Sequence, residues 1–207
     1  MRAADNPFAV QKVLRIRYRL SDPAWEGLLE RLATLRYRAA IVGPHGRGKT
    51  TLLEDLAPRL EALGFRIRSV MLHTGDRRLR REHREALLQG MSPRDLLCVD
   101  GAEQLGRIAW LALLARSQRA GGLLITSHRP GLLPTLVECE TNPELLREIV
   151  RELLGRDAEG SKELFARHEG NIREALREMY DQWALTPGPS PGRGRVPPAA
   201  PRHPKTE

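Results

Sequence analysis

The stretch of sequence that decides the fold is a glycine-rich run that reads Gly43-Pro44-His45-Gly46-Arg47-Gly48-Lys49-Thr50. It fits the pattern G-x-x-x-x-G-K-[S/T] of a phosphate-binding loop. Apolar residues at 39–42 precede the run and a helical pattern over 51–63 follows it. It therefore lies between a strand and a helix, as a phosphate-binding loop requires, and it predicts a nucleotide site.

Each residue type in this loop suits the binding of phosphate. Glycines let the backbone turn tightly and bring its N–H groups toward phosphate oxygens, and the next helix adds the positive end of its dipole. Lys49 supplies a positive charge for the β- and γ-phosphates, and the Thr50 hydroxyl is a ligand for Mg²⁺. ATP with Mg²⁺ is the expected ligand. The predicted nucleotide-binding residues are Gly43, Pro44, His45, Gly46, Arg47, Gly48, Lys49, Thr50 and Thr51. Positions 45 and 47 are variable in this pattern, so their side chains receive no individual role.

The second motif is the apolar run Leu96–Val99 followed by Asp100. A continuous apolar run is typical of a strand buried on both faces. The Asp100 carboxylate then lies at the carboxyl edge of the sheet, beside the phosphate loop, where the Mg²⁺ shell needs an acceptor. We predict Thr50 and Asp100 as the metal-site residues. The alternative is that Asp100 caps the next helix.

Strands and helices alternate along the chain, which favours an α/β fold with a parallel sheet. Apolar runs predict five strands, at 39–42, 65–72, 96–99, 123–126 and 133–139. Helical spacing predicts a basic helix over 77–89 and a long helix over 102–119.

Together, the loop and Asp100 resemble the Walker A and Walker B motifs of P-loop ATPases that carry an additional strand between the two motifs. This branch includes AAA+ proteins, RecA-like motors and ABC ATPases. The resemblance covers about residues 39–140, and bacterial helper ATPases of the AAA+ kind are similar in scale and layout. It implies a three-layer fold with a parallel sheet in the order 5-1-4-3-2 and a small C-terminal helical lid.

The strand at 123–126 ends in polar residues and looks like the sensor-1 position of AAA+ proteins. This resemblance makes Thr126 or Ser127 a candidate to contact the γ-phosphate or to hold the attacking water. His128 also looks like the switch histidine of ABC ATPases. The alternative is that these residues only cap a helix or form a turn.

The chain is purely helical in pattern from 143 to 185, and this stretch is the predicted lid. Within it, Gly170–Arg173 resembles the sensor-2 segment of AAA+ proteins, which implies that Arg173 lies over the γ-phosphate. The alternative is an exposed arginine on an amphipathic helix. Residues 1–38 are predicted as a lead-in and helix, and residues 39–142 as the nucleotide-binding core. The Pro/Gly-rich residues 186–207 are predicted to be a disordered tail.

One departure from the family pattern concerns hydrolysis. Many of these ATPases place Glu directly after the Walker B Asp to polarise water, whereas this chain has Gly101. The nearest carboxylate is Glu103, which either activates the water or completes a capping box with Asp100. The predicted catalytic residues are Lys49, Glu103, Ser127 and Arg173. Nucleotide binding is thus a firmer inference than hydrolysis.

The chain carries a formal net charge of +8, which permits contact with nucleic acid without requiring it. The segment Arg77–Arg84 holds five arginines, and it is either a surface for nucleic acid or an acidic protein, or a solvated helix face. A nucleotide-dependent homo-oligomer is a further candidate assembly. In that case Arg129, Arg147 and Arg151 are candidate donors of an arginine to a neighbouring subunit.

The two cysteines, Cys98 and Cys139, lie in apolar runs without metal-ligand neighbours, which favours buried thiols in a reducing compartment. The start of the chain lacks the apolar segment of a signal peptide, and no apolar run approaches about 20 residues. We therefore expect a cytoplasmic protein that does not enter a membrane.

The leading hypothesis is a Mg²⁺-dependent AAA+-like ATPase that acts as a molecular switch or helper. A non-hydrolysing, nucleotide-dependent binding module is the alternative that Gly101 supports. A small P-loop kinase fits the size, but the extra strand before Asp100 disfavours it. A GTPase and an ABC ATPase are disfavoured because the sequence has no guanine-reading Asn/Thr-Lys-x-Asp segment and no Leu-Ser-Gly-Gly-Gln segment.

Overall fold

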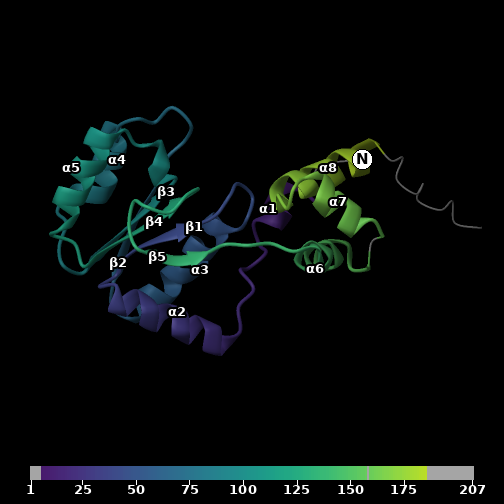
Figure 1. Cartoon of the computed structure of the whole chain (residues 1–207), viewed down its shortest axis with the longest axis horizontal. Helices are drawn as coiled ribbons and strands as arrows, with labels where there is room; N and C mark the ends of the chain where they lie inside the picture. The colour runs from purple at the N-terminus through teal and green to yellow at the C-terminus, as the bar shows by residue number, and fades with distance from the viewer. Residues whose placement is uncertain (1–5, 158, 186–207) are drawn as a thin grey trace, which may run out of the picture.

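The computed structural model describes residues 6–157 and 159–185, so the predicted tail at 186–207 lies outside the described residues. A parallel sheet forms the centre of the larger part of the chain (Figure 1). Its spatial order is β2 (Arg66–Met71), β3 (Asp95–Asp100), β4 (Gly122–Ser127), β1 (Arg38–Val42) and β5 (Thr135–Glu138). This order is the predicted 5-1-4-3-2 order read from the opposite edge, and it confirms the predicted fold class.

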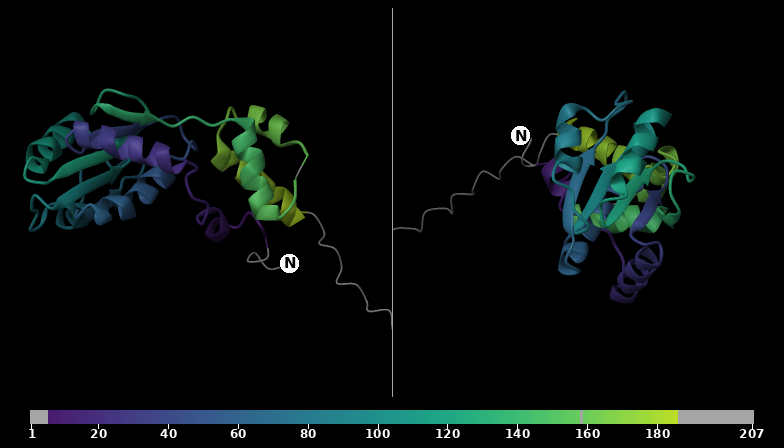
Figure 2. Two further views of the ribbon diagram at one scale, coloured as in Figure 1. Left: turned by 90° about the horizontal axis from the view of Figure 1, so that it is seen from below. Right: turned by 90° about the vertical axis from the view of Figure 1, so that its left-hand side faces the viewer.

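Helices cover both faces of the sheet and complete three layers (Figure 2). Helices α2 (Asp22–Thr34) and α3 (Lys49–Ala62) pack on the face that carries Ile41. Helices α4 (Arg81–Leu88) and α5 (Arg107–Ser117) pack on the face that carries Val42. Because neighbouring residues of a strand point to opposite faces and both faces are covered, the middle residues of the central strands are apolar.

The predicted basic helix over 77–89 is wrong in its first turn, because α4 begins at Arg81. The preceding residues form a turn around the buried carboxylate of Asp76. This carboxylate accepts hydrogen bonds from the backbone N–H of His73 at 2.9 Å and from the Arg80 guanidinium at 2.6 Å. The turn holds Arg77 to Arg80 outside the helix.

The predicted long helix over 102–119 is also wrong, because the chain forms a short 3₁₀ turn, η2 (Ala102–Gln104), before α5 starts at Arg107. Gly106 between them is extended, with φ −66° and ψ 155°. Its N–H donates to the carbonyl oxygen of Arg77 at 3.0 Å. This tertiary hydrogen bond competes with helix continuation, and the sequence pattern does not reveal it.

A separate helical region lies beside the sheet and consists of α6 (Pro143–Leu154), α7 (Ser161–Arg167) and α8 (Ile172–Leu185) (Figure 1). Residues from near the start of the described chain complete its core. Phe8 is buried against residues of α6, α7 and α8, and α1 (Val10–Val13) follows it. The Asn6 side chain donates to the carbonyl oxygen of Tyr180 at 3.0 Å. Among the described residues, no helix has the length and apolar character that a membrane span needs.

Candidate nucleotide-binding site

The phosphate-binding loop lies at the carboxyl end of β1 and leads directly into α3. Gly48 is the N-cap of α3 with φ 82°, a left-handed conformation that glycine adopts readily. The Lys49 side chain is buried, and its Nζ donates to the carbonyl oxygens of Gly43 at 2.7 Å and Pro44 at 2.8 Å. Burial lowers the pKa of Lys49, while the nearby Glu103 carboxylate opposes this shift. The loop therefore holds the lysine charge at the position where phosphate oxygens would need it.

Asp100 at the end of β3 contacts the start of α3. The Thr50 hydroxyl donates to Asp100 Oδ2 at 2.8 Å, and the Thr126 hydroxyl donates to Asp100 Oδ1. The Thr126 oxygen in turn accepts from the N–H of Gly101 at 2.8 Å. Both carboxylate oxygens are thus engaged by residues of α3 and β4, and in the described chain no side chain caps η2. The alternative that Asp100 caps the next helix is therefore not what the geometry shows.

The donor set around Thr50 and Asp100 fits Mg²⁺. It offers one hydroxyl and one carboxylate, and within residues 6–157 and 159–185 no cluster of three or more His, Cys, Asp or Glu side chains could hold a metal. Mg²⁺ is usually bound by one or two protein carboxylates together with waters and substrate phosphates. Thr50 and Asp100 would therefore hold the ion only together with a bound nucleotide.

Glu103 approaches the loop from η2, and it contacts His128 there. Its Oε1 lies 3.3 Å from Nδ1 of His128, at the end of β4. Its Oε2 is buried and has no hydrogen-bond partner among the described residues. The His128 ring lies 3.6 Å from the ring of His45 in the phosphate loop, measured between centroids. Burial lowers the pKa of His128, and Glu103 opposes that effect.

The conformation of Gly101 explains why a glutamate does not follow Asp100 directly. Gly101 has φ 79°, and a Cβ atom built on it would lie 2.9 Å from the carbonyl oxygen of Leu72. A side chain at this position would be strained and would clash with the backbone. The same left-handed residue turns the chain back so that η2 brings Glu103 toward the site.

The remaining two predicted catalytic residues lie at the edge of this cluster. The buried Ser127 hydroxyl donates to the carbonyl oxygen of Arg129 at 2.8 Å, while the neighbouring Thr126 makes the contact with Asp100. Arg173 lies in the first turn of α8, and its charge contributes to the lowered pKa of Lys49. The roles of Ser127 and Arg173 stay predictions.

The helical region touches the phosphate loop at the turn before α8. The Arg47 guanidinium donates to the carbonyl oxygen of Glu169 at 3.0 Å. A Cβ atom built on Gly46, whose φ is 69°, would meet Oδ1 of Asn171 at 1.7 Å, so a side chain at this position would displace Asn171. The sequence pattern gave Arg47 no role, and its contact with Glu169 depends on tertiary packing alone.

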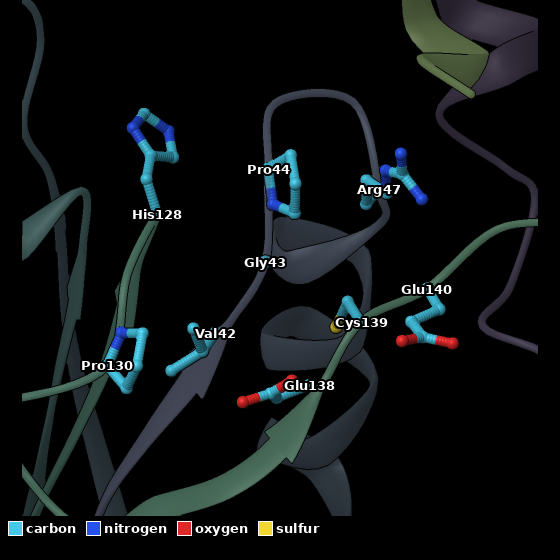
Figure 3. A pocket seen from close by; sticks show the side chains of 9 residues that line it. All are labelled: Val42, Gly43, Pro44, Arg47, His128, Pro130, Glu138, Cys139 and Glu140. Atoms are coloured by element: carbon cyan, nitrogen blue, oxygen red, sulfur yellow. The ribbon is translucent and has the colours of Figure 1, made fainter. Parts of the chain in front are cut away.

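A cavity of about 240 Å³ opens on the β5 side of the loop. Figure 3 shows the loop arching above the start of α3, with His128 to one side and Arg47 on the arm that leads into α3. Residues of β5 and the segment after it form the other wall. The cavity lining consists of Val42, Gly43, Pro44, Arg47, His128, Pro130, Glu138, Cys139 and Glu140. Acidic and basic side chains therefore both line this side of the loop.

The basic segment Arg77–Arg84 begins just after β2, at the same edge of the sheet. Two of its arginines are paired, because Arg80 contacts Asp76 and Arg81 contacts Glu85. The other three are exposed and form no ion pair in the part of the chain that the structure describes: Arg77, Arg78 and Arg84.

Solved structures share this architecture, and 57 chains match it. One is the Thermotoga maritima RuvB Holliday junction branch migration motor, with 21% sequence identity and a TM-score of 0.57 over 81% of this chain and 64% of that chain. This chain has an AAA+-like P-loop ATPase fold. NtrX from Brucella abortus, solved in complex with ATP, matches with 14% identity and a TM-score of 0.50 over 87% of this chain and 53% of that one.

The chain spans less than two thirds of the length of either structure. At these identities the likeness concerns the fold. No protein-family model and no curated protein sequence matches the chain.

Proposed function

We propose that this chain binds ATP with Mg²⁺, hydrolyses it, and acts as a nucleotide-controlled switch or helper. The observation that carries the proposal is the 2.8 Å contact between the Thr50 hydroxyl and the Asp100 carboxylate, directly beside the buried Lys49. These three groups offer a hydroxyl ligand, a carboxylate and a phosphate counter-charge in one place. A merely structural glycine turn does not require this combination.

The residues around the loop suggest how hydrolysis proceeds. Lys49 neutralises the phosphates, and bound Mg²⁺ supplies further positive charge on them. The free Oε2 of Glu103 accepts a proton from a water molecule, whose oxygen attacks the γ-phosphorus. The bond from the γ-phosphorus to the bridging oxygen breaks, and ADP and inorganic phosphate leave. Arg173 offsets the charge that develops during this step, and the Glu103 proton passes to solvent.

The test of this function compares ATP binding and turnover in the wild type and in Lys49→Ala. We expect Lys49→Ala to lose measurable ATP binding, because it removes the buried positive charge of the loop. Lys162→Ala is the matched control, since Lys162 is an exposed lysine on α7 and should bind ATP as the wild type does. An unchanged ATP affinity in Lys49→Ala would overturn the proposal.

A non-hydrolysing binding module is the second candidate function, and Gly101 is the observation that favours it. In such a module the nucleotide would only change the surface offered to a partner. The rate of ATP turnover by the wild type separates the two candidates. ATP binding without any turnover would favour the module.

We further propose that nucleic acid is the partner of the basic segment Arg77–Arg84. Three exposed arginines without ion pairs give this segment a free positive charge, and the solved RuvB is a motor that acts on Holliday junctions. Each phosphate contact should contribute about 0.9 to the slope of log affinity against log salt. The double variant Arg77→Ala/Arg78→Ala should therefore reduce the slope for duplex DNA by about 2.

The matched control for that double variant is Arg116→Ala/Arg119→Ala, which removes two exposed arginines at the far end of α5. Equal salt slopes in the two double variants would mean that the basic segment is not the contact surface. Stimulation of ATP turnover by DNA in the wild type would connect the two proposals.

We propose that residues 143–185 act as a lid on the nucleotide-binding core at 39–142, in a protein of the cytoplasm. The hydrogen bond from Arg47 to the turn before α8 supports the role of a lid, because it joins the helical region to the phosphate loop. If ATP drives assembly of several copies, one of the exposed Arg129, Arg147 and Arg151 can reach a neighbouring site. Molecular mass in solution with and without ATP tests this assembly.

A further inference from the structure

Three titratable side chains converge beside the phosphate loop from three different elements. Glu103 comes from η2, His128 from the end of β4, and His45 from the loop itself. Oε1 of Glu103 lies 3.3 Å from Nδ1 of His128, and the two histidine rings lie 3.6 Å apart. We propose that His128 is a positioning residue that holds Glu103 as the water-activating carboxylate. This inference rests on the proposed ATPase function.

The two oxygens of Glu103 differ in a way that suits this role. Oε1 lies 3.3 Å from His128 Nδ1 and accepts a hydrogen bond from the neighbouring Gln104 side chain at 3.4 Å, whereas Oε2 is buried without a partner among the described residues. A buried carboxylate oxygen without a donor is unfavourable in a purely structural ion pair. It is suited to accept a hydrogen bond from a ligand or a water molecule. Burial lowers the pKa of the neighbouring Lys49, and the negative charges of Glu103 and Asp100 both oppose this shift.

Glu103 needs a neighbouring side chain to fix its position because it lies in a short turn. It belongs to a three-residue 3₁₀ turn that follows the left-handed Gly101, and Glu has three side-chain torsions to fix. A catalytic carboxylate that is displaced by about 1 Å can lose a hundredfold in rate. His128 directly follows the buried, central strand β4, and its ring lies 3.6 Å from the ring of His45, measured between centroids. The pair is thereby linked to the loop that binds the phosphates.

In the reaction, His128 transfers no proton. Its Nδ1 stays in contact with Oε1, 3.3 Å away, so that Oε2 points to the water and accepts one proton as the water oxygen bonds to the γ-phosphorus. The β–γ bridging oxygen leaves with the electron pair of the broken bond on ADP. The charged groups near His128 are Glu103, Lys49, His45 and Asp100, and all of them remain in place during this step.

The test measures steady-state ATP hydrolysis and ATP affinity for variants of His128. We expect His128→Ala to lower kcat about tenfold to a hundredfold, with the ATP dissociation constant within about twofold of the wild type. His128→Asn should recover part of kcat, because its side-chain N–H₂ can take the place of Nδ1. The control is His83→Ala, since His83 on α4 contacts Glu82 away from the site and should leave kcat unchanged.

Coupling between the two residues gives the second readout. If His128 acts through Glu103, then His128→Ala should cause no further loss of kcat once Glu103→Gln has removed the carboxylate. Unchanged kcat in His128→Ala, or fully additive losses in the double variant, would overturn the role of His128 alone. A wild-type protein that binds ATP without turnover would instead refute the proposed hydrolysis, and this role with it.

Discussion

Replacing Gly101 by alanine should destabilise the protein by about 3 kcal/mol. Gly101 has φ 79°, and a left-handed conformation costs a residue with a Cβ atom about 1–2 kcal/mol. The new Cβ would also lie 2.9 Å from the Leu72 carbonyl oxygen, which cannot move freely because the Leu72 N–H donates to the backbone carbonyl oxygen of Asp100 at 2.8 Å. Relieving such an overpacked contact adds about 1–3 kcal/mol.

Urea denaturation of Gly101→Ala and of a matched glycine variant measures this cost. Gly64 also has positive φ, 91°, but a Cβ atom there would meet nothing within 4 Å. Gly64→Ala should therefore cost only the backbone strain of about 1–2 kcal/mol. Equal losses in the two variants would refute the argument from the Leu72 contact. So would a Gly101→Glu variant that keeps its stability and hydrolyses ATP faster than the wild type.

Three further outcomes are expected. Phe8→Ala should destabilise the helical region by about 3 kcal/mol, because it empties a buried site in that core, and Trp183 fluorescence should report the loss. Acid should weaken the fold through Asp95, whose pKa the guanidinium of Arg66 holds well below its usual range. The ionised Asp95 contributes fully to the free energy of unfolding above its unfolded-state pKa of about 3.9, and this contribution is lost as the pH falls below that value. In Asp95→Asn, the free energy of unfolding should therefore depend less on pH in this acidic range. Arg47→Ala should raise amide hydrogen exchange in the turn before α8 several-fold while exchange in β3 stays unchanged.

The sequence predicted the fold, and the closeness of the glycine-rich loop to Asp100, because their signals are local. A phosphate-binding loop between a strand and a helix, and an apolar strand ending in Asp100, are patterns that neighbouring residues determine. The confirmed sheet order followed from the family resemblance that these two motifs carry. The helical pattern predicted over 143–185 agrees with α6, α7 and α8 in the structure.

Features that depend on tertiary contacts were not predictable in the same way. The break before Arg107 depends on a hydrogen bond to Arg77, a residue that lies 30 positions earlier in the chain. The pairing of Glu103 with His128 depends on the turn at Gly101, and no sequence spacing encodes it. The sequence shows that glycine occupies position 101, but it does not show why a side chain is excluded there. The reason is the nearby carbonyl oxygen of Leu72, which is brought to Gly101 by the fold.

The hydrogen bond from Asn6 to Tyr180 and the burial of Phe8 have a consequence for biosynthesis and for protein engineering. Phe8 is part of a core that closes only when α8, more than 160 positions later in the chain, has been made. Until then, Phe8 remains an uncovered aromatic side chain on the nascent polypeptide. For the same reason, α6 to α8 do not form a complete core by themselves. A variant that lacks the residues before Asp22 would leave part of their apolar surface uncovered.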